Sequence, residues 1–325
     1  MSNRGSVLER LGVELPIVQA GMGGGLAGAE LAAAVSEAGG LGTIGILPAE
    51  ALASELRAAR ERTDRPVAVN LILHLARRGH WEAARGADAV VTFWGRPRRR
   101  TDGVWIHQCG SVEEALAAHA AGADGVIAQG VEAGGHVRGT VPGDELLAAV
   151  RRALPSGYPV LRSGGIAEAA DVSAALAAGA HAAVLGTRFL MTRESGAHDA
   201  YKRRLTEARE TVLTELFGVG WPSAPHRVVP NAATARWLRR DPRGPLPARL
   251  ANRLTGPLVA RVPMRYAAAM AGRQATWAPF FGPSAPTAGG PASLVETAPL
   301  YAGETVARID DVLPAGDVVA SLVGN

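Results

Sequence analysis

The residues with the clearest chemical potential lie together in one short loop. Gly134 and Gly135 come directly before His136, and the loop follows a short apolar run at residues 126–128. That run is too short for a helix and is typical of a buried strand. Two glycines would let the backbone approach a flat ligand closely, because neither carries a Cβ. A histidine beside such a ligand could move protons near neutral pH, since the ordinary pKa of its side chain is about 6.5.

Two further loops have the composition of an anion-binding site. Ser163, Gly164 and Gly165 follow one expected strand, and Gly186 and Thr187 follow the next. Backbone amides of glycine-containing loops can bind a phosphate, and Thr187 would add a hydroxyl donor. In α/β barrels the loops after the seventh and eighth strands form the usual phosphate site. We therefore favour phosphate binding over the alternative, in which these glycines serve only in tight turns.

Amide and metal-binding side chains give weaker signals. Asn70 and Gln129 lie at the carboxyl ends of two other expected strands, and their amides could bind the edge of a heterocycle or cap the loops. Both interpretations stay open at this point. His107 and Cys109 alternate on one strand, but a metal site usually needs three or four ligands. We expect no metal.

Apolar runs alternate with helical segments roughly every 20–25 residues, which is the pattern of a parallel sheet with crossover helices. Strands are expected over residues 16–20, 41–46, 66–73, 88–93, 104–109, 126–128, 159–163 and 182–185. Helices are expected over residues 29–38, 48–63, 75–85, 111–121, 144–154 and 168–178. The connection at 94–103 is too short and too basic for a helix. Eight such units predict an α/β fold, a (β/α)8 TIM barrel.

A doubly wound dinucleotide-binding sheet is the rival architecture. Residues 23–28 nominally match G-x-G-x-x-G, but the match is weak in so glycine-rich a stretch. The acidic partner that the motif requires would be Glu50, which lies beyond Pro48 at the start of a helix. The barrel is favoured.

The pattern changes after about residue 200. We assign residues 1–200 to the barrel and residues 201–299 to a mainly helical capping segment, with helices at 201–217 and 232–240. Trp277, Phe280 and Phe281 need burial, which favours a cap over a flexible linker. Residues 300–325 are expected to return to the barrel, as a helix interrupted at Pro314.

Charge and composition exclude several classes of protein. The net charge of +4 is small for 325 residues. We interpret the arginine clusters at 96–100 and 236–243 as solvated faces, and we therefore expect no nucleic-acid partner. Residues 274–295 are uncharged but contain four prolines, which excludes a regular spanning helix, and we expect no membrane partner. A single cysteine, Cys109, and no recognisable signal peptide predict a cytoplasmic protein.

Several of these motifs together resemble the nitronate monooxygenase family. They are residues 129–136 (Gln-Gly-Val-Glu-Ala-Gly-Gly-His), residues 19–22 (Gln-Ala-Gly-Met), residues 163–165 (Ser-Gly-Gly) and residues 186–190 (Gly-Thr-Arg-Phe-Leu). The likeness covers about residues 10–200, and residues 300–303 resemble the closing motif of the family. The resemblance implies a barrel that holds FMN, with its phosphate on Ser163, Gly164, Gly165, Gly186 and Thr187. The flavin ring would lie against Gly21, Met22, Asn70, Gln129 and Gly134.

The resemblance also implies a reaction. Alkyl nitronates, with neutral nitroalkanes as a further option, would be oxidised by O₂ to a carbonyl compound and nitrite through a flavin semiquinone. His136 would be catalytic, orienting the anion or taking the α-proton. The same motif occurs in NAD(P)H-dependent flavin reductases of the enoyl-acyl-carrier-protein and NADH:quinone types, which is one alternative. A flavin-binding protein without turnover is the other. The oligomeric state is open, a homodimer being one option.

Two features depart from the pattern of the family. The connection at 94–103 is short, which leaves the substrate open. Arg138 follows Val137, one place later than in the commoner His-Arg-Gly order, which puts a local anion contact in question.

Overall fold

A closed barrel of eight parallel strands forms the centre of the computed structural model, which describes residues 7–259, 261–262, 266 and 274–323. The strands are β1 (Ile17–Gln19), β2 (Gly42–Ile44), β3 (Val67–Ile72), β4 (Ala89–Phe93), β5 (Val104–Cys109), β6 (Gly125–Gln129), β8 (Val160–Ser163) and β9 (Ala183–Leu185). Their order is β1-β9-β8-β6-β5-β4-β3-β2, and a bridge between Val18 and Leu41 joins the two ends. The predicted TIM barrel and its eight strands are confirmed.

Branched apolar side chains fill the barrel interior. Val91, Ile106, Ile127 and Leu161 belong to one buried cluster, and Val7 from α1 (Val7–Leu11) joins it. Bulky branched residues of this kind make the inside of such a barrel a packed core rather than a pore. All eight strands are parallel, so their carboxyl ends open at the same end of the barrel, where the loops can build a site.

Helices surround the barrel as the sequence predicted. They are α2 (Ala29–Glu37), α3 (Ala49–Arg60), α4 (Arg78–Ala83) with η1 (Ala84–Gly86), α5 (Val112–Ala120), α6 (Gly143–Ala153), α7 (Ala169–Ala177) and the short α8 (Thr187–Leu190). Residues 94–103 contain no helix, as expected. The chain returns at its end through η4 (Glu304–Arg308) and α13 (Ala315–Leu322), which packs on α2 and α7. Pro314 immediately precedes α13, so the predicted interruption is confirmed.

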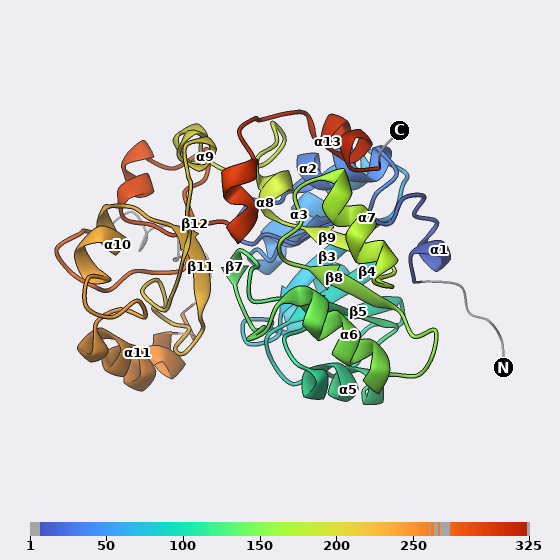
Figure 1. The fold of residues 1–325 in the computed structure, drawn as a ribbon, viewed down its shortest axis with the longest axis horizontal. Helices are drawn as coiled ribbons and strands as arrows, with labels where there is room; N and C mark the ends of the chain where they lie inside the picture. The colour runs from blue at the N-terminus through green and yellow to red at the C-terminus, as the bar shows by residue number, and fades with distance from the viewer. Residues whose placement is uncertain (1–6, 260, 263–265, 267–273, 324–325) are drawn as a thin grey trace.

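The capping segment lies beside the carboxyl ends of the strands, and it includes a small sheet that the sequence did not predict (Figure 1). Its elements are α9 (Asp199–Thr206), β10 (Val212–Thr214), β11 (His226–Val229), α10 (Ala232–Trp237), α11 (Leu246–Val259), η3 (Ala292–Glu296) and β12 (Leu300–Tyr301). The sheet order is β10-β11-β12, and β7 (Gly135–His136) also pairs with β11. The sheet therefore joins the cap to the barrel loop that carries His136.

One predicted helix of the cap is wrong. The helix expected over residues 201–217 ends at Thr206, and Val212–Thr214 form β10 instead. Val212 pairs with Val228 across the antiparallel ladder. The strand depends on a partner well beyond the local sequence window, which is why local periodicity missed it. None of the helices in the described part of the chain is both long and apolar enough to cross a membrane.

Candidate active site

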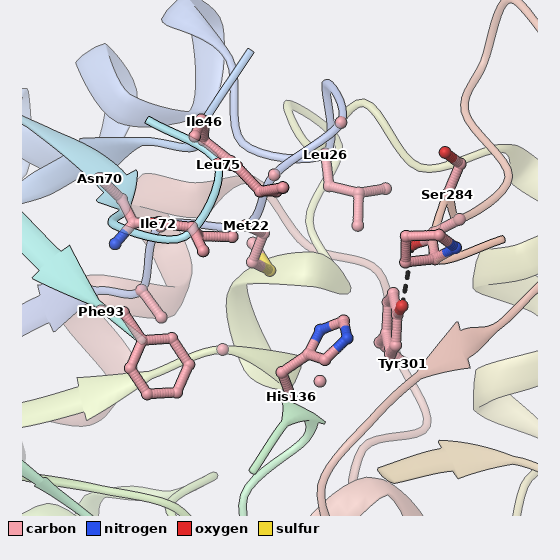
Figure 2. A pocket seen from close by; sticks show the side chains of 18 of the residues that line it. Met22, Leu26, Ile46, Asn70, Ile72, Leu75, Phe93, His136, Ser284 and Tyr301 are labelled. Atoms are coloured by element: carbon pink, nitrogen blue, oxygen red, sulfur yellow. Dashed lines mark hydrogen bonds between the residues drawn. The ribbon is translucent and has the colours of Figure 1, made fainter. Parts of the chain in front are cut away.

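A cavity of about 910 Å³ lies between the carboxyl end of the barrel and the cap. Figure 2 shows side chains from the barrel and from the cap facing one another across it. All the site residues predicted from the sequence line this cavity: Gly21, Met22, Asn70, Gln129, Gly134, His136, Ser163, Gly164, Gly165, Gly186 and Thr187. The structure thus brings together residues from five separate barrel loops.

His136 points into the cavity, near Met22 and Tyr301 (Figure 2). Its ring stacks on Trp221, with 3.9 Å between the centroids and 17° between the planes. Trp94 contacts it edge-on at 6.0 Å, and the Tyr301 ring lies 5.6 Å away. Its Nε2 atom is buried and has no hydrogen-bond partner among the described residues. A buried polar atom that the protein leaves unpaired is typical of a group that binds a ligand.

Burial sets the protonation state of His136. It lowers the pKa of the imidazole well below 6.5, and neighbouring His226 lowers it further. His226 lies directly opposite His136 in the β7–β11 pair. Its Nε2 accepts a hydrogen bond from the Phe217 amide at 3.2 Å, so its Nδ1 is the protonated nitrogen and donates to the Ala224 carbonyl at 2.9 Å. Burial lowers the pKa of His226 to about 4, and both imidazoles are neutral at pH 7.

The side-chain amide of Gln129 holds the loop around His136. Its Nε2 donates to the His136 carbonyl at 3.0 Å, and its Oε1 accepts from the Arg138 amide at 2.9 Å. This geometry supports the loop-capping interpretation of Gln129, and contact with a flavin remains a prediction. The Arg138 guanidinium pairs with Glu114 and lies 4.8 Å from the centre of the Trp94 ring. Arg138 does not line the cavity, so its offset position places its charge outside the site.

The two glycines before His136 each have a structural role. A Cβ on Gly134 would lie 2.5 Å from the carbonyl carbon of Ala302, so Gly134 is needed for close packing of the closing segment. Gly135 has φ of +71° with open space around it, so its backbone conformation requires glycine. Both glycines also line the cavity, so the expectation that they admit a flat ligand stays a prediction beside these structural reasons.

The two loops expected to bind phosphate meet at one side of the cavity. No hydrogen bond from the backbone amides of Gly164, Gly165 or Gly186 is found within the described residues. Thr187 Oγ1 accepts a hydrogen bond from the Gly303 amide at 2.9 Å. Its hydroxyl proton thus remains able to donate to a ligand. These donors are therefore available to a ligand, and phosphate binding stays a prediction.

A buried ion pair between Glu132 and Arg162 supports the Gly164–Gly165 loop. Glu132 accepts a hydrogen bond from the Gly143 amide at 2.9 Å and pairs with Arg162 at 3.2 Å. The Arg162 guanidinium also donates to the carbonyl oxygen of Gly164. Both side chains of the pair are largely buried, with 9% of the Arg162 surface and 13% of the Glu132 surface exposed. Neither side chain lines the cavity, so the pair can hold the loop without occupying the site.

Sequence reasoning missed the residues that the cap contributes. Trp221, Phe280, Ser284 and Tyr301 line the cavity. Tyr301 donates a hydrogen bond to the Pro283 carbonyl at 2.8 Å, and its own carbonyl accepts one from Tyr201 at 2.7 Å. Tyr301 belongs to the closing motif, which was a usable signal. Nothing in the local sequence distinguished Trp221.

His107 and Cys109 are engaged by protein groups. His107 Nδ1 lies 2.7 Å from Thr92 Oγ1, and the Cys109 thiol donates to the Ile127 carbonyl at 3.3 Å. Burial lowers the pKa of His107 to about 4 and raises the pKa of Cys109 to about 12. No group of three or more candidate metal ligands occurs in the part of the chain that the structure describes.

Comparison with known proteins places the chain in a family. Residues 6–97 and 95–325 match the sequence profile of nitronate monooxygenase. A nitronate monooxygenase from Pseudomonas aeruginosa is 35% identical over 285 residues, covering 69% of this chain and 80% of the relative. The (3aS,4S,5R,7aS)-5-hydroxy-7a-methyl-1-oxo-octahydro-1H-indene-4-carboxyl-CoA dehydrogenase of Mycobacterium tuberculosis is 35% identical over 244 residues, covering 70% of this chain and 67% of the relative.

Solved structures show the same relationship over nearly the whole chain. The nitroalkane oxidase of Streptomyces ansochromogenes has a TM-score of 0.75 at 32% identity, covering 98% of this chain and 96% of that one. FabK from Thermotoga maritima has a TM-score of 0.76 at 27% identity, covering 98% and 94%. The site described above lies within the matched residues. The chain therefore belongs to the nitronate monooxygenase family of flavin-dependent oxidoreductases.

Proposed function

We propose that this protein oxidises alkyl nitronates, and neutral nitroalkanes in addition, with O₂ and FMN, to a carbonyl compound and nitrite. The observation that carries the proposal is His136. Its ring faces a cavity that two glycine loops also line, and its Nε2 is buried without a partner among the described residues. The 32% identity to a nitroalkane oxidase over 98% of the chain supports the choice of substrate.

The residues present fit a flavin mononucleotide. The amides of Gly164, Gly165 and Gly186 and the hydroxyl of Thr187 would bind its phosphate. Met22 and Asn70, together with Gly21 and Gly134, would lie along its ring. The cavity of about 910 Å³ is at the upper end of the roughly 300–1,000 Å³ of small-molecule sites, which leaves room for a small substrate as well. Bound FMN would supply the acceptor for substrate electrons and their donor to O₂.

The environment of His136 determines what it can do in this reaction. A neutral imidazole has one nitrogen that accepts a proton and one that donates a hydrogen bond. It can thus take the α-proton of a neutral nitroalkane or donate to an oxygen of a nitronate. Stacking on Trp221 and the hydrogen bond from Gln129 to the His136 carbonyl hold the ring in place. General base catalysis of this kind contributes about 10²–10⁴ in rate.

The cap completes the site by covering it. Trp221 and Tyr301 line the cavity beside His136. Trp221 is 4% exposed, and its ring lies against His136 rather than in solvent. Exclusion of water keeps the imidazole neutral and strengthens its hydrogen bond to an anionic substrate.

A second candidate function has specific support. The chain is as similar to a carboxyl-CoA dehydrogenase as to a nitronate monooxygenase, at 35% identity, and it shares its fold with FabK. The second candidate is an NAD(P)H-dependent flavin reductase acting on an acyl thioester or a quinone, and the carboxyl-CoA dehydrogenase supports a thioester as its substrate. The barrel and its glycine loops would serve either reaction, so the electron donor distinguishes them.

Anaerobic reduction of the purified protein tests both candidates. We expect yellow protein that releases FMN on denaturation and is bleached rapidly by propyl nitronate but slowly by NADH. Rapid bleaching by NADH alone would establish the second candidate instead. Protein without flavin, or flavin that neither donor reduces, would contradict both.

Replacement of His136 tests its assigned role. We expect His136→Asn to lose about 10²–10⁴ of the turnover rate while it retains its FMN. His119→Asn is the matched control, since His119 contacts Tyr158 and does not line the cavity. Unchanged turnover in His136→Asn would refute the role of His136.

A further inference from the structure

Helix α11 packs against the cap with its small residues rather than its large ones. Ala248 and Gly256 are its buried positions. Asn252, midway between them, accepts a hydrogen bond from the Gly220 amide at 3.0 Å. A Cβ on Gly256 would lie 2.8 Å from Pro222, so the helix approaches that loop too closely for a larger side chain. The inner face of α11 is thus small and partly polar.

The opposite face of α11 is a row of exposed leucines. Leu246, Leu250, Leu254 and Leu258 recur every four residues and are 58%, 51%, 80% and 64% exposed. A helix on the surface of a globular domain normally turns such a row toward the core. Large exposed apolar patches mark surfaces that bind proteins or membranes. Figure 1 shows α11 at the outer edge of the cap, away from the barrel.

The neighbouring chain extends this apolar character. Val262, Trp277 and Phe280 are 42%, 74% and 56% exposed. Of the ten large apolar side chains found exposed in the described residues, eight lie between residues 246 and 280. The sequence predicted that Trp277 and Phe280 would be buried, and this expectation is wrong; only Phe281 of the three aromatics is buried. We call Leu246, Leu250, Leu254, Leu258 and Val262, together with Phe280, which lines the cavity as Val262 does, the leucine face.

The charge of this segment is entirely positive. Residues 242–295 contain six arginines and neither aspartate nor glutamate. Asp241 pairs with Arg243 and Arg249. Arg253 and Arg261 are exposed and have no carboxylate partner in the described part of the chain. Two copies meeting through this face would bring like charges together, whereas an anionic surface would complement it.

We propose that the leucine face binds the surface of an anionic lipid membrane, with α11 lying in the plane of the headgroups. Exposed leucine and phenylalanine, with arginines that have no carboxylate partner among the described residues, are typical of helices that lie in this layer. At 14 residues, α11 is about 21 Å long, shorter than the roughly 30 Å core of a bilayer, so it lies on the membrane rather than across it. The sequence-based expectation of no membrane partner was based on the absence of a spanning helix, whereas α11 would lie on the membrane surface.

The leucine face is continuous with the mouth of the cavity. Val262 and Phe280 belong to both. If the cavity has the proposed function, a neutral nitroalkane with a long alkyl chain would enter it directly from the lipid. This consequence depends on the proposed function, whereas membrane binding itself does not.

Sedimentation with lipid vesicles tests the proposal on the full-length flavoprotein. We expect binding to vesicles of equal parts phosphatidylcholine and phosphatidylglycerol, and little binding to phosphatidylcholine alone. Each of Leu250→Ser and Leu254→Ser should weaken binding about tenfold, and the double variant about a hundredfold. Leu116→Ser is the matched control, because Leu116 is 42% exposed on α5, outside the leucine face. It should bind as the unaltered protein does.

Three measurements keep the result unambiguous. Flavin content and thermal unfolding of the double variant establish that it is folded, and light scattering gives its mass. Absence of binding to phosphatidylglycerol vesicles, or equal binding by the double variant, overturns the proposal. A dimer that the double variant converts to a monomer also overturns it, because a second copy then covers the leucine face. Vesicle binding is measured without turnover, so its result tests membrane binding independently of the proposed reaction.

Discussion

Adding one methyl group at Gly165 should separate phosphate binding from folding. Gly165 has φ of +63°, and a Cβ placed there would lie 2.8 Å from Cγ of Glu132. An alanine in this left-handed conformation costs about 1 kcal/mol. The new methyl group also pushes directly on Glu132, which together with Arg162 holds the loop. Gly165→Ala therefore strains the loop that we propose binds the phosphate.

The magnitude follows from the contacts that must shift. The Glu132 carboxylate accepts from the Gly143 amide at 2.9 Å and pairs with Arg162 at 3.2 Å. Loss of one hydrogen bond to a charged group costs roughly 1.5–3 kcal/mol. Together with the cost of the left-handed alanine, the native conformation of the loop is destabilised by roughly 3 kcal/mol. The loop can relieve part of this strain by moving, but it then leaves the geometry that binds the phosphate. We expect FMN to bind about ten- to a hundredfold more weakly.

Gly157→Ala is the matched control for this experiment. Gly157 has φ of +77°, with no atom within 4 Å of the position that the new methyl group would occupy, and it does not line the cavity. It should lose about 1 kcal/mol of unfolding free energy and bind FMN normally. Affinity is measured by quenching of FMN fluorescence on titration with flavin-free protein. Equal FMN affinity in Gly165→Ala and Gly157→Ala would refute the assignment of this loop to the phosphate.

Two pH dependences follow from the buried histidines. His136 acts as a base only when neutral, and its pKa is lowered well below 6.5. The kcat/KM for a neutral nitroalkane should therefore stay flat as the pH falls from about 8 to 6.5, and a decline centred near 6.5 would show an ordinary, solvated imidazole. Stability should respond at lower pH, because His107 and His226 have pKa values of about 4 when folded. Below about pH 6.5 the histidines of the unfolded chain take up protons before those of the folded chain, so each should remove about 2 kcal/mol of unfolding free energy by pH 5. Urea unfolding measures this loss. An unfolding free energy that stays constant in this range would contradict the burial of His107 and His226 as neutral groups.

The barrel could be predicted from the sequence because each of its units is local. Short apolar runs such as Val67–Ile72 are separated by helices with their own start and stop signals, and parallel pairing follows from that alternation. The missing helix at 94–103 was also predictable, since ten residues of mostly arginine, proline and glycine cannot form one. Eight strands closing on themselves then place the loops after each strand at one end, which is why the predicted site residues meet.

The cap could not be predicted in the same way, because its elements depend on distant partners. β10 exists because β11 pairs with it, and Trp221 enters the site because the cap folds over the barrel. The expectation that the aromatic residues of the cap are buried also failed in part. Phe281 is buried, but Trp277 and Phe280 are exposed, so residue type alone did not decide which face of the segment turns inward.

The pairing of β7 with β11 decides what chemistry the His136 loop can perform. The sequence placed His136 at the rim of the barrel, but its neutral state results from burial against Trp221 and from His226, which β11 holds opposite it. A barrel loop with the same Gly-Gly-His sequence would contain an ordinary imidazole if the cap were absent or differently folded. The cap also lines the cavity, and two relatives that are each 35% identical to this chain have different activities. We therefore expect the cap, more than the motif, to decide whether this imidazole acts on a nitronate or on a thioester.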